Sequence, residues 1–174
     1  MRRVLLACAL CVWGLGNAEA QQRMTTVSAQ AGSGLSMGTG GATVGGQSMV
    51  TMRRTPVFLE VEARTYSTSN PDPVIGAALR VELDGRASIA VVPRVQLLRC
   101  AGRIEFRAFL GAPFFFAPFS MLGAEGGGGI TIPFGKHFSL GVTAMIDAFF
   151  WGSDLPDDTV LIGINGMAGV EMRL

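Results

Sequence analysis

The stretch that decides the fold is "ALRVELDGRASIAVVPRVQL", residues 78–97. Aliphatic side chains occupy alternate positions on both sides of Asp84-Gly85, and charged or polar side chains fill most of the others. This period of two is typical of a β-strand with two different faces. An Asp-Gly pair between two such runs is a strong signal of a β-hairpin. Pro93 fits worst, because a proline within a strand cannot donate to the ladder of hydrogen bonds.

The same alternation recurs from residue 57 onward and predicts strands over residues 57–66, 74–83, 86–98, 103–111, 120–133, 138–150 and 159–174. No segment shows the 3.6-residue period of an amphipathic helix. The strands exceed the five or six residues of an average soluble strand and suit the roughly 9–11 residues of a tilted membrane strand. Since single-chain bacterial barrels have an even number of strands, we expect an eighth strand over residues 42–53, followed by a turn at 53–56.

The first residues have the features of a targeting segment. Arg2 and Arg3 precede a short apolar core, and Ala18-Glu19-Ala20 forms an A-x-A cleavage site. We therefore expect residues 1–20 to be a signal peptide and the chain to be exported. A lipoprotein attached through Cys8 is the alternative.

Cleavage at this site would divide the remaining chain into two parts. Residues 21–41 are rich in Gly and Ser and predict a flexible arm. Residues 42–174 would form the β domain. Only Cys100 would remain in the mature chain, which excludes an intramolecular disulfide.

The composition bears on which face of the strands is in water. Hydrophobic residues make up 49% of the chain and charged residues only 16%, below the roughly 25% of a typical soluble domain. In a soluble periplasmic β-sandwich or lipocalin-like barrel, the aliphatic face would be internal and would bind a small apolar ligand. In a closed membrane barrel, the aliphatic face would contact lipid and the charged face would line a lumen.

The charged face is nearly balanced between acids and arginines. In the membrane barrel these side chains form a structural ion-pair network inside the lumen, where an unpaired charge would be costly. The predicted network consists of Glu60, Glu62, Arg64, Arg80, Glu82, Arg94, Arg103, Glu105, Arg107, Glu125, Asp147, Glu171 and Arg173.

The A-x-A signal, the alternating strands and the alternating end "AGVEMRL" (168–174) together resemble small bacterial outer-membrane β-barrels, the class of OmpA-type and OmpX-type domains. The resemblance implies an all-β, antiparallel up-and-down transmembrane barrel of eight strands in the cell outer membrane. It implies outer-membrane lipid, lipopolysaccharide and the barrel assembly machinery as partners. In that class the last strand usually ends in an aromatic residue, whereas this chain ends in Leu174. An eight-stranded barrel is filled by its side chains, so we expect a structural or surface-assembly component, neither a wide pore nor an enzyme, without cofactor or metal.

Two loops are candidates for surface contacts with an envelope protein or with lipopolysaccharide. The loop 112–119 contains Phe114, Phe115 and Phe116, and the loop 151–158 contains Asp154, Asp157 and Asp158. Phe149, Phe150 and Trp151 would form an interfacial aromatic belt.

Other activities have little support in the residues. A barrel-borne lipid hydrolase would need His137, the only histidine, beside a serine and a carboxylate, but we expect His137 in a periplasmic turn. Nucleic acid is not an expected partner, because Arg53-Arg54 is the only basic cluster that stands out.

Overall fold

The structure is a computed structural model that describes residues 23–44, 47–67, 74–83, 87–100, 103–153, 155 and 159–174. The predicted signal peptide and the turn Asp84-Gly85 lie outside the described residues. The same is true of the three predicted surface contacts Asp154, Asp157 and Asp158.

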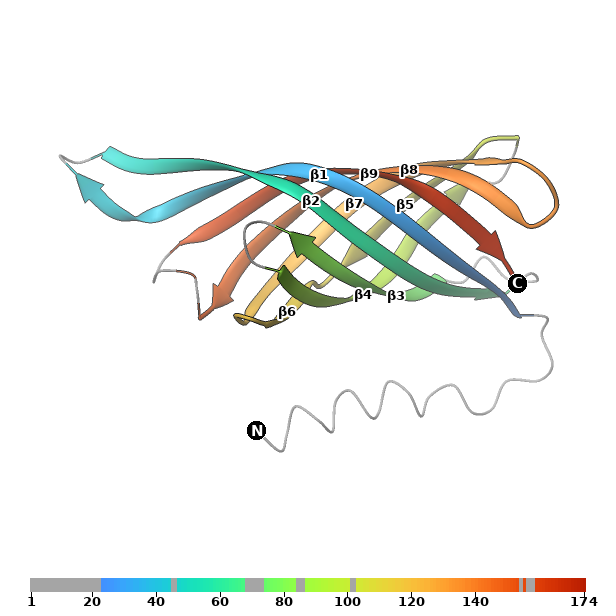
Figure 1. The fold of residues 1–174 in the computed structure, drawn as a ribbon, viewed down its shortest axis with the longest axis horizontal. Coiled ribbons are helices and arrows are strands. Elements are labelled where there is room, and N and C mark those ends of the chain that lie inside the picture. The colour runs from blue at the N-terminus through green and yellow to red at the C-terminus, as the bar shows by residue number, and fades with distance from the viewer. Residues whose placement is uncertain are drawn as a thin grey trace, which may run out of the picture.

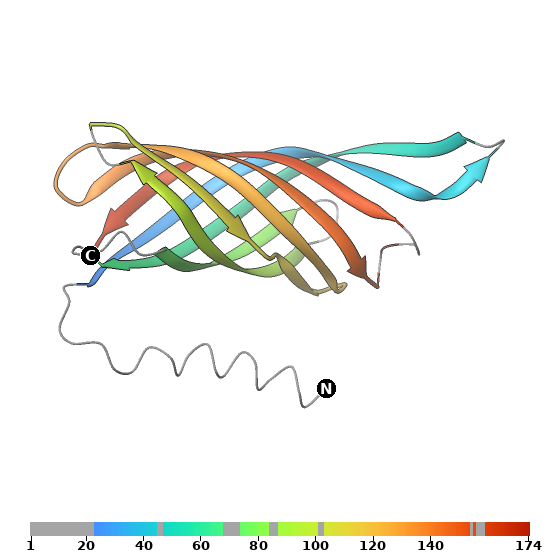
Figure 2. The ribbon, with the colours of Figure 1, turned by 180° about the vertical axis from the view of Figure 1, so that it is seen from behind.

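The described residues form one antiparallel sheet that closes on itself (Figures 1 and 2). Its strands are β1 (Arg23–Val44), β2 (Gln47–Ser67), β3 (Val74–Leu83), β4 (Ala87–Cys100), β5 (Glu105–Gly111), β6 (Phe114–Ala117), β7 (Met121–Pro133), β8 (Phe138–Gly152) and β9 (Val160–Arg173). Consecutive strands pair along the chain, except that β5 and β6 each pair with β4 and β7, and β1 pairs with β9 to close the barrel. No helix in the described ranges is long and apolar enough to cross a membrane.

The barrel is eight-stranded, because β5 and β6 are two pieces of one interrupted barrel strand. We call each of these eight barrel strands a stave. Both pieces pair with β4 on one side and with β7 on the other. The predicted eight-stranded, antiparallel up-and-down barrel is thus confirmed. We call the end where β1 begins and β9 ends the terminal end, and the opposite end the hairpin end.

The first stave is not where the sequence placed it. The predicted flexible arm over residues 21–41 is wrong, because β1 occupies most of it and pairs with both β2 and β9. The predicted strand over 42–53 and the turn at 53–56 are also wrong. β1 ends at Val44, which pairs with Gln47 at the start of β2, and β2 is a single strand as far as Ser67.

The β1–β2 hairpin extends beyond the other staves at the hairpin end (Figure 1). The pairing of β1 with β9 reaches only to Thr39↔Val160, and that of β2 with β3 only to Val57↔Leu83. Past these points the two strands pair with each other alone among the described residues. Their length therefore makes a two-stranded projection at this end.

Pro93 lies within β4 opposite Ala77 of β3, and the neighbouring stave accommodates it. The carbonyl oxygen of Pro93 accepts a hydrogen bond from the Ala112 N–H at 3.0 Å. Because the N–H and C=O of one strand residue point to the same side, the missing N–H of Pro93 faces the interruption between β5 and β6. The proline therefore removes no hydrogen bond from the β3–β4 ladder.

An apolar cluster fills the hairpin end of the lumen, and we call it the apolar plug. Its buried members are Ala78, Ala90, Val92, Phe115, Met121 and Phe149, with Phe119, Leu155 and Leu161 packed against them. The Phe115 and Phe149 rings meet edge to face, with centroids 5.5 Å apart. The prediction that residues 112–119 form an exposed loop is therefore wrong at Phe115, and the belt position predicted for Phe149 is wrong as well.

Candidate functional site

Burial in this barrel is inverted relative to a soluble protein. On β8, Leu140, Val142 and Ile146 are more than half exposed, whereas Thr143 and Asp147 are buried. The same alternation holds on β2, β3 and β4, where the aliphatic positions face outward and the charged positions face inward. A soluble monomer rarely exposes a continuous apolar surface of this kind. The alternative of a soluble barrel with an apolar interior is thereby contradicted.

Aromatic side chains border the apolar surface at both ends. Phe114, Phe116, Phe150 and Trp151 are exposed near the hairpin end, and Phe106, Phe134 and Phe138 near the terminal end. The segment of β8 between Phe138 and Phe150, at about 3.3 Å per residue and a tilt near 40°, corresponds to about 30 Å along the barrel axis. This height matches the hydrocarbon core of a bilayer with its aromatic girdles. The exterior is that of a membrane-spanning barrel.

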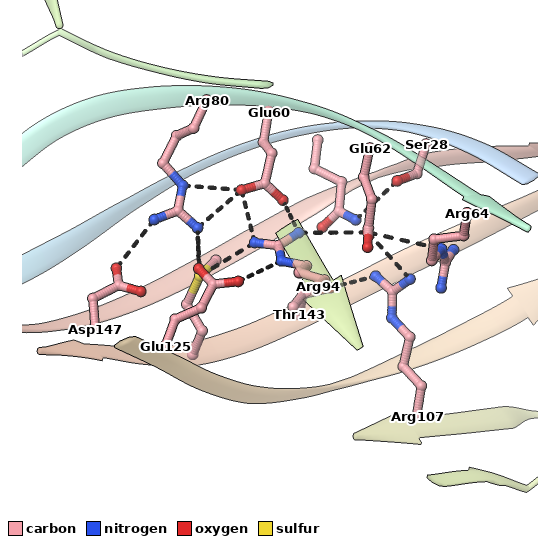
Figure 3. A network of polar contacts seen from close by, with 12 residues as sticks. Ser28, Glu60, Glu62, Arg64, Arg80, Arg94, Arg107, Glu125, Thr143 and Asp147 are labelled. Carbon is pink, nitrogen blue, oxygen red and sulfur yellow. Dashed lines mark hydrogen bonds and ion pairs between the residues drawn. The ribbon is translucent and has the colours of Figure 1, made fainter. Parts of the chain in front are cut away.

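The inner face brings charged residues from seven strands, β2, β3, β4, β5, β7, β8 and β9, into one network, most of which Figure 3 shows. In the half nearer the hairpin end, Arg80 of β3 donates to three carboxylates. The distances are 2.9 Å from Nε to Glu60 Oε2, 2.7 Å from Nη2 to Glu125 Oε2 and 3.2 Å from Nη1 to Asp147 Oδ2. Arg94 of β4 donates to both Glu60 and Glu125 and stacks over the Phe109 ring, with 4.8 Å from its guanidinium carbon to the ring centroid.

The half nearer the terminal end holds a second set of pairs. Arg64 of β2 donates to Glu171 of β9 and lies 3.8 Å from Glu62. Arg107 of β5 lies 3.6 Å from Glu171 and 3.8 Å from Glu62, and it donates to Thr143 Oγ1 at 2.9 Å. Glu62 also lies 3.5 Å from Arg94, which connects the two halves.

The remaining predicted network residues lie near the mouths of the lumen. Glu105 pairs with Arg173 and, at 3.2 Å, with Arg99, which is not a member of the predicted network. Glu82 is half-buried near the end of β3. Arg103 does not join the network: it is exposed in the bend before β5 and makes no ion pair within the described part of the chain. The lumen position predicted for Arg103 is wrong, because the stave begins only at Glu105.

Neutral side chains complete the network, and sequence reasoning missed them. Asn165 donates to Asp147 Oδ2, and Gln96 Oε1 accepts from Arg64 at 3.5 Å. Met145 places its sulfur 3.0 Å from Arg80 Nη2. All three occupy inward positions, because every second residue of a strand points to the same face. Their place in this alternation is the signal that could have identified them.

The arrangement is suited to holding the barrel closed. Every guanidinium in the two halves contacts at least two carboxylates, and the planar fork of arginine favours such multiple contacts. With the apolar plug beyond Asp147, side chains occupy the lumen at the hairpin end.

No catalytic set accompanies this network in the described residues. His137 is exposed in the bend between β7 and β8, and its side chain makes no hydrogen bond to a serine or an acid of the described chain. Within the same ranges, no group of three or more His, Cys, Asp or Glu is placed to hold a metal ion.

Comparison with known proteins bears on the fold. The crystal structure of Neisserial surface protein A has a TM-score of 0.52 and 8% sequence identity, over 86% of this chain and 96% of that chain. The N-terminal β-barrel domain of Pseudomonas aeruginosa OprF has a TM-score of 0.50 and 10% identity, over 90% of this chain and 100% of that chain. No protein-family model and no curated protein matches the chain. The predicted resemblance to small outer-membrane β-barrels is therefore confirmed at the level of the fold.

Proposed function

We propose that this protein is a small outer-membrane β-barrel that acts as a structural or surface-interaction component of the cell envelope. The observation that carries the proposal is the inverted burial of a closed barrel, whose outer face is apolar and whose lumen is occupied by paired charges. Such a surface requires lipid around it, and a closed β-barrel has no unpaired edge in the bilayer. Lipid and lipopolysaccharide are accordingly the proposed partners of the outer face, and the assembly machinery is the proposed partner during insertion.

The lumen supports an anchoring role and not a wide pore. Arg80 and Asp147 are each 1% exposed, and the apolar plug lies between them and the hairpin end. An eight-stranded barrel leaves an interior just wide enough for its own side chains. A hydrated path would require both the plug and the ion pairs to rearrange together.

The hairpin end supports the interaction part of the proposal. The β1–β2 hairpin projects beyond the rim there, and Phe114 and Phe116 are exposed beside it. We place this end outside the cell and the terminal end in the periplasm, as an export signal at residues 1–20 would require. An envelope or surface protein that contacts the chain would then meet the projecting hairpin first.

Fractionation tests the location. We expect the native chain in the outer-membrane fraction, and we expect its gel mobility to change on boiling, because a folded barrel resists detergent until it is heated. Release by osmotic shock as a free protein would overturn the proposal.

Cysteine labelling tests the orientation. Cys100 is exposed at the terminal end of β4 and is the only cysteine that cleavage of the predicted signal peptide would leave. A membrane-impermeant maleimide should not label the native chain in intact cells, but should label Ser48→Cys in a Cys100→Ser background. Labelling of Cys100 alone in intact cells would reverse the orientation.

Conductance tests the closed lumen. Reconstituted into a planar bilayer, the native barrel should give no steady open channel. A stable conductance of the native barrel would contradict the structural role and favour transport.

A further inference from the structure

The turn between β7 and β8 places a lysine beyond the aromatic border of the terminal end (Figure 1). A hydrogen bond of 2.9 Å from the Phe134 N–H to the Phe138 carbonyl oxygen closes this turn. Gly135 permits the turn, because its φ of 111° is in the left-handed region that other residues rarely adopt. Lys136 and His137 follow, and both are exposed. The fold therefore fixes the backbone that carries this cation just outside the apolar surface.

The two phenylalanine side chains show where the turn meets the membrane. Phe134 and Phe138 are 51% and 46% exposed, and their rings stack with centroids 6.2 Å apart and an interplanar angle of 24°. Exposed aromatic residues at the end of a membrane barrel mark the interface between hydrocarbon and water. Lys136 lies beyond this aromatic pair, so its ammonium group is at the level of the lipid phosphates.

A second cation lies beside the turn on the neighbouring stave. Arg103 is exposed in the bend before β5, and β5 pairs with β7 from Glu105↔Thr131 onward. Extending this register by two residues brings Arg103 opposite Pro133, directly before the turn. Because neighbouring strands are only about 4.8 Å apart, the long side chains of Arg103 and Lys136 can reach the same phosphate group.

The described side chains of this rim offer these two cations no acidic partner. Neither Arg103 nor Lys136 makes an ion pair within the described part of the chain. Glu105, the acid next to Arg103 in the sequence, is paired with Arg99 and Arg173. Guanidinium and ammonium groups both donate charge-assisted hydrogen bonds to phosphate. The rim therefore fits a phosphate that carries a net negative charge.

We propose that Arg103 and Lys136 together bind the headgroup of an anionic phospholipid at the terminal end of the barrel. The acyl chains of the same lipid pack on the exposed rings of Phe106, Phe134 and Phe138. A zwitterionic headgroup carries a cation of its own, which the two basic side chains repel, so the site prefers a headgroup such as phosphatidylglycerol. The inference rests on the proposed function, because it requires the barrel to span a lipid bilayer.

Tryptophan quenching tests this preference at each end of the barrel. Cleavage of the predicted signal peptide would leave Trp151, in the aromatic border of the hairpin end, as the only tryptophan. Phe138→Trp combined with Trp151→Phe moves the tryptophan to the terminal end, and Phe134→Trp in the same background is a second reporter of that end. Each chain is inserted into phosphatidylcholine vesicles that contain the same fraction of either brominated phosphatidylglycerol or brominated phosphatidylcholine, since bromine quenches tryptophan on contact.

At the terminal end, brominated phosphatidylglycerol should quench the tryptophan more strongly than brominated phosphatidylcholine. Its association constant relative to phosphatidylcholine should rise about fivefold for each cation that contacts the headgroup. Trp151 of the native chain should show no such preference. Equal quenching of the terminal-end tryptophan by the two brominated lipids, or an equal preference at both ends, would overturn the proposal.

Substitutions in the terminal-end reporter locate the lipid. Lys136→Gln and Arg103→Gln should each lower the preference about fivefold, whereas Arg53→Gln, which removes a cation from the projecting part of β2, should leave it unchanged. A preference that survives both rim substitutions would contradict the site. In phosphatidylcholine alone the two cations have no anionic lipid to bind, so these substitutions should not alter the stability of the barrel there.

Gel mobility without boiling shows whether each chain has inserted and folded. A chain that inserts and has no lipid preference contradicts only the phospholipid site. A native chain that does not insert into either kind of vesicle contradicts the proposed function itself, and the site with it.

Discussion

Replacing Arg80 by methionine should destabilise the barrel more than any other single removal of charge. Arg80 is 1% exposed and donates to Glu60, Glu125 and Asp147, each within 3.2 Å. Methionine keeps most of the length of the side chain and removes the charge. Glu60 and Glu125 retain Arg94, whereas Asp147 loses its only ion-pair partner in the described chain.

The size of the effect follows from the burial of these groups. Removing one partner of a buried ion pair costs about 3–5 kcal/mol, because the remaining charge is left without compensation. Arg80→Met should therefore lower the free energy of unfolding by about that amount. Adding Asp147→Asn removes the carboxylate that Arg80→Met leaves unpaired. The free energy of unfolding of the double variant should therefore be about 1–3 kcal/mol higher than the sum of the two single changes predicts.

Denaturant unfolding in lipid vesicles, followed by tryptophan fluorescence and by gel mobility without boiling, measures these differences. Arg103→Met is the matched control, since Arg103 is exposed outside the network, and its stability should stay close to that of the native chain. If Arg80→Met unfolds with the same free energy as the Arg103 control, or if Asp147→Asn restores nothing, the central network does not stabilise the barrel.

Three further substitutions test the packing and the faces by the same unfolding assay. A Cβ atom at Gly169 would collide with a backbone carbonyl of β1, whereas one at Gly166 would meet nothing within 4 Å. Gly169→Ala should therefore lower the free energy of unfolding by about 1–3 kcal/mol. Equal stability of Gly169→Ala and Gly166→Ala would refute the close approach of β1 and β9. Phe115→Ala should cost about 3–5 kcal/mol and Phe116→Ala clearly less, because Phe115 is fully buried in the plug and Phe116 is 49% exposed; the reverse order would place residues 112–119 outside the lumen. Leu79→Arg should cost about 2–4 kcal/mol in a bilayer, and an unchanged stability would mean that this face of β3 is in water.

Much of the barrel could be predicted from alternation alone. Once Glu60 and Leu59 are assigned to opposite faces, the period of two assigns every position of a stave. The inward charges of β2, β3, β4, β7, β8 and β9 followed from this parity, since long staves have no freedom to change face without a bulge. Arg103 was wrongly assigned to the lumen because the alternation tells which face a strand residue occupies, but not at which residue the strand begins.

The first stave was missed because its two faces differ little in polarity. Inward Thr26 and Ser28 alternate with outward Ala29 and Ala31, and glycines follow. In the barrel these glycines have a steric role: a Cβ atom at Gly34 would collide with the Asn165 side chain in the lumen. A composition that suggested flexibility is therefore a requirement of close packing between β1 and β9.

The sequence by itself determined the strand pattern, the opposition of an apolar and a charged face, and the near-equality of acids and arginines. It did so because these properties depend on residues next to each other along the chain. Only the tertiary structure decided which charges meet, that β5 and β6 share one stave, and that Phe115 is internal. These features depend on the register between neighbouring strands and on the closure of the barrel, which bring together side chains as far apart in the sequence as Arg64 and Glu171. The alternation along a single strand carries no information about that pairing.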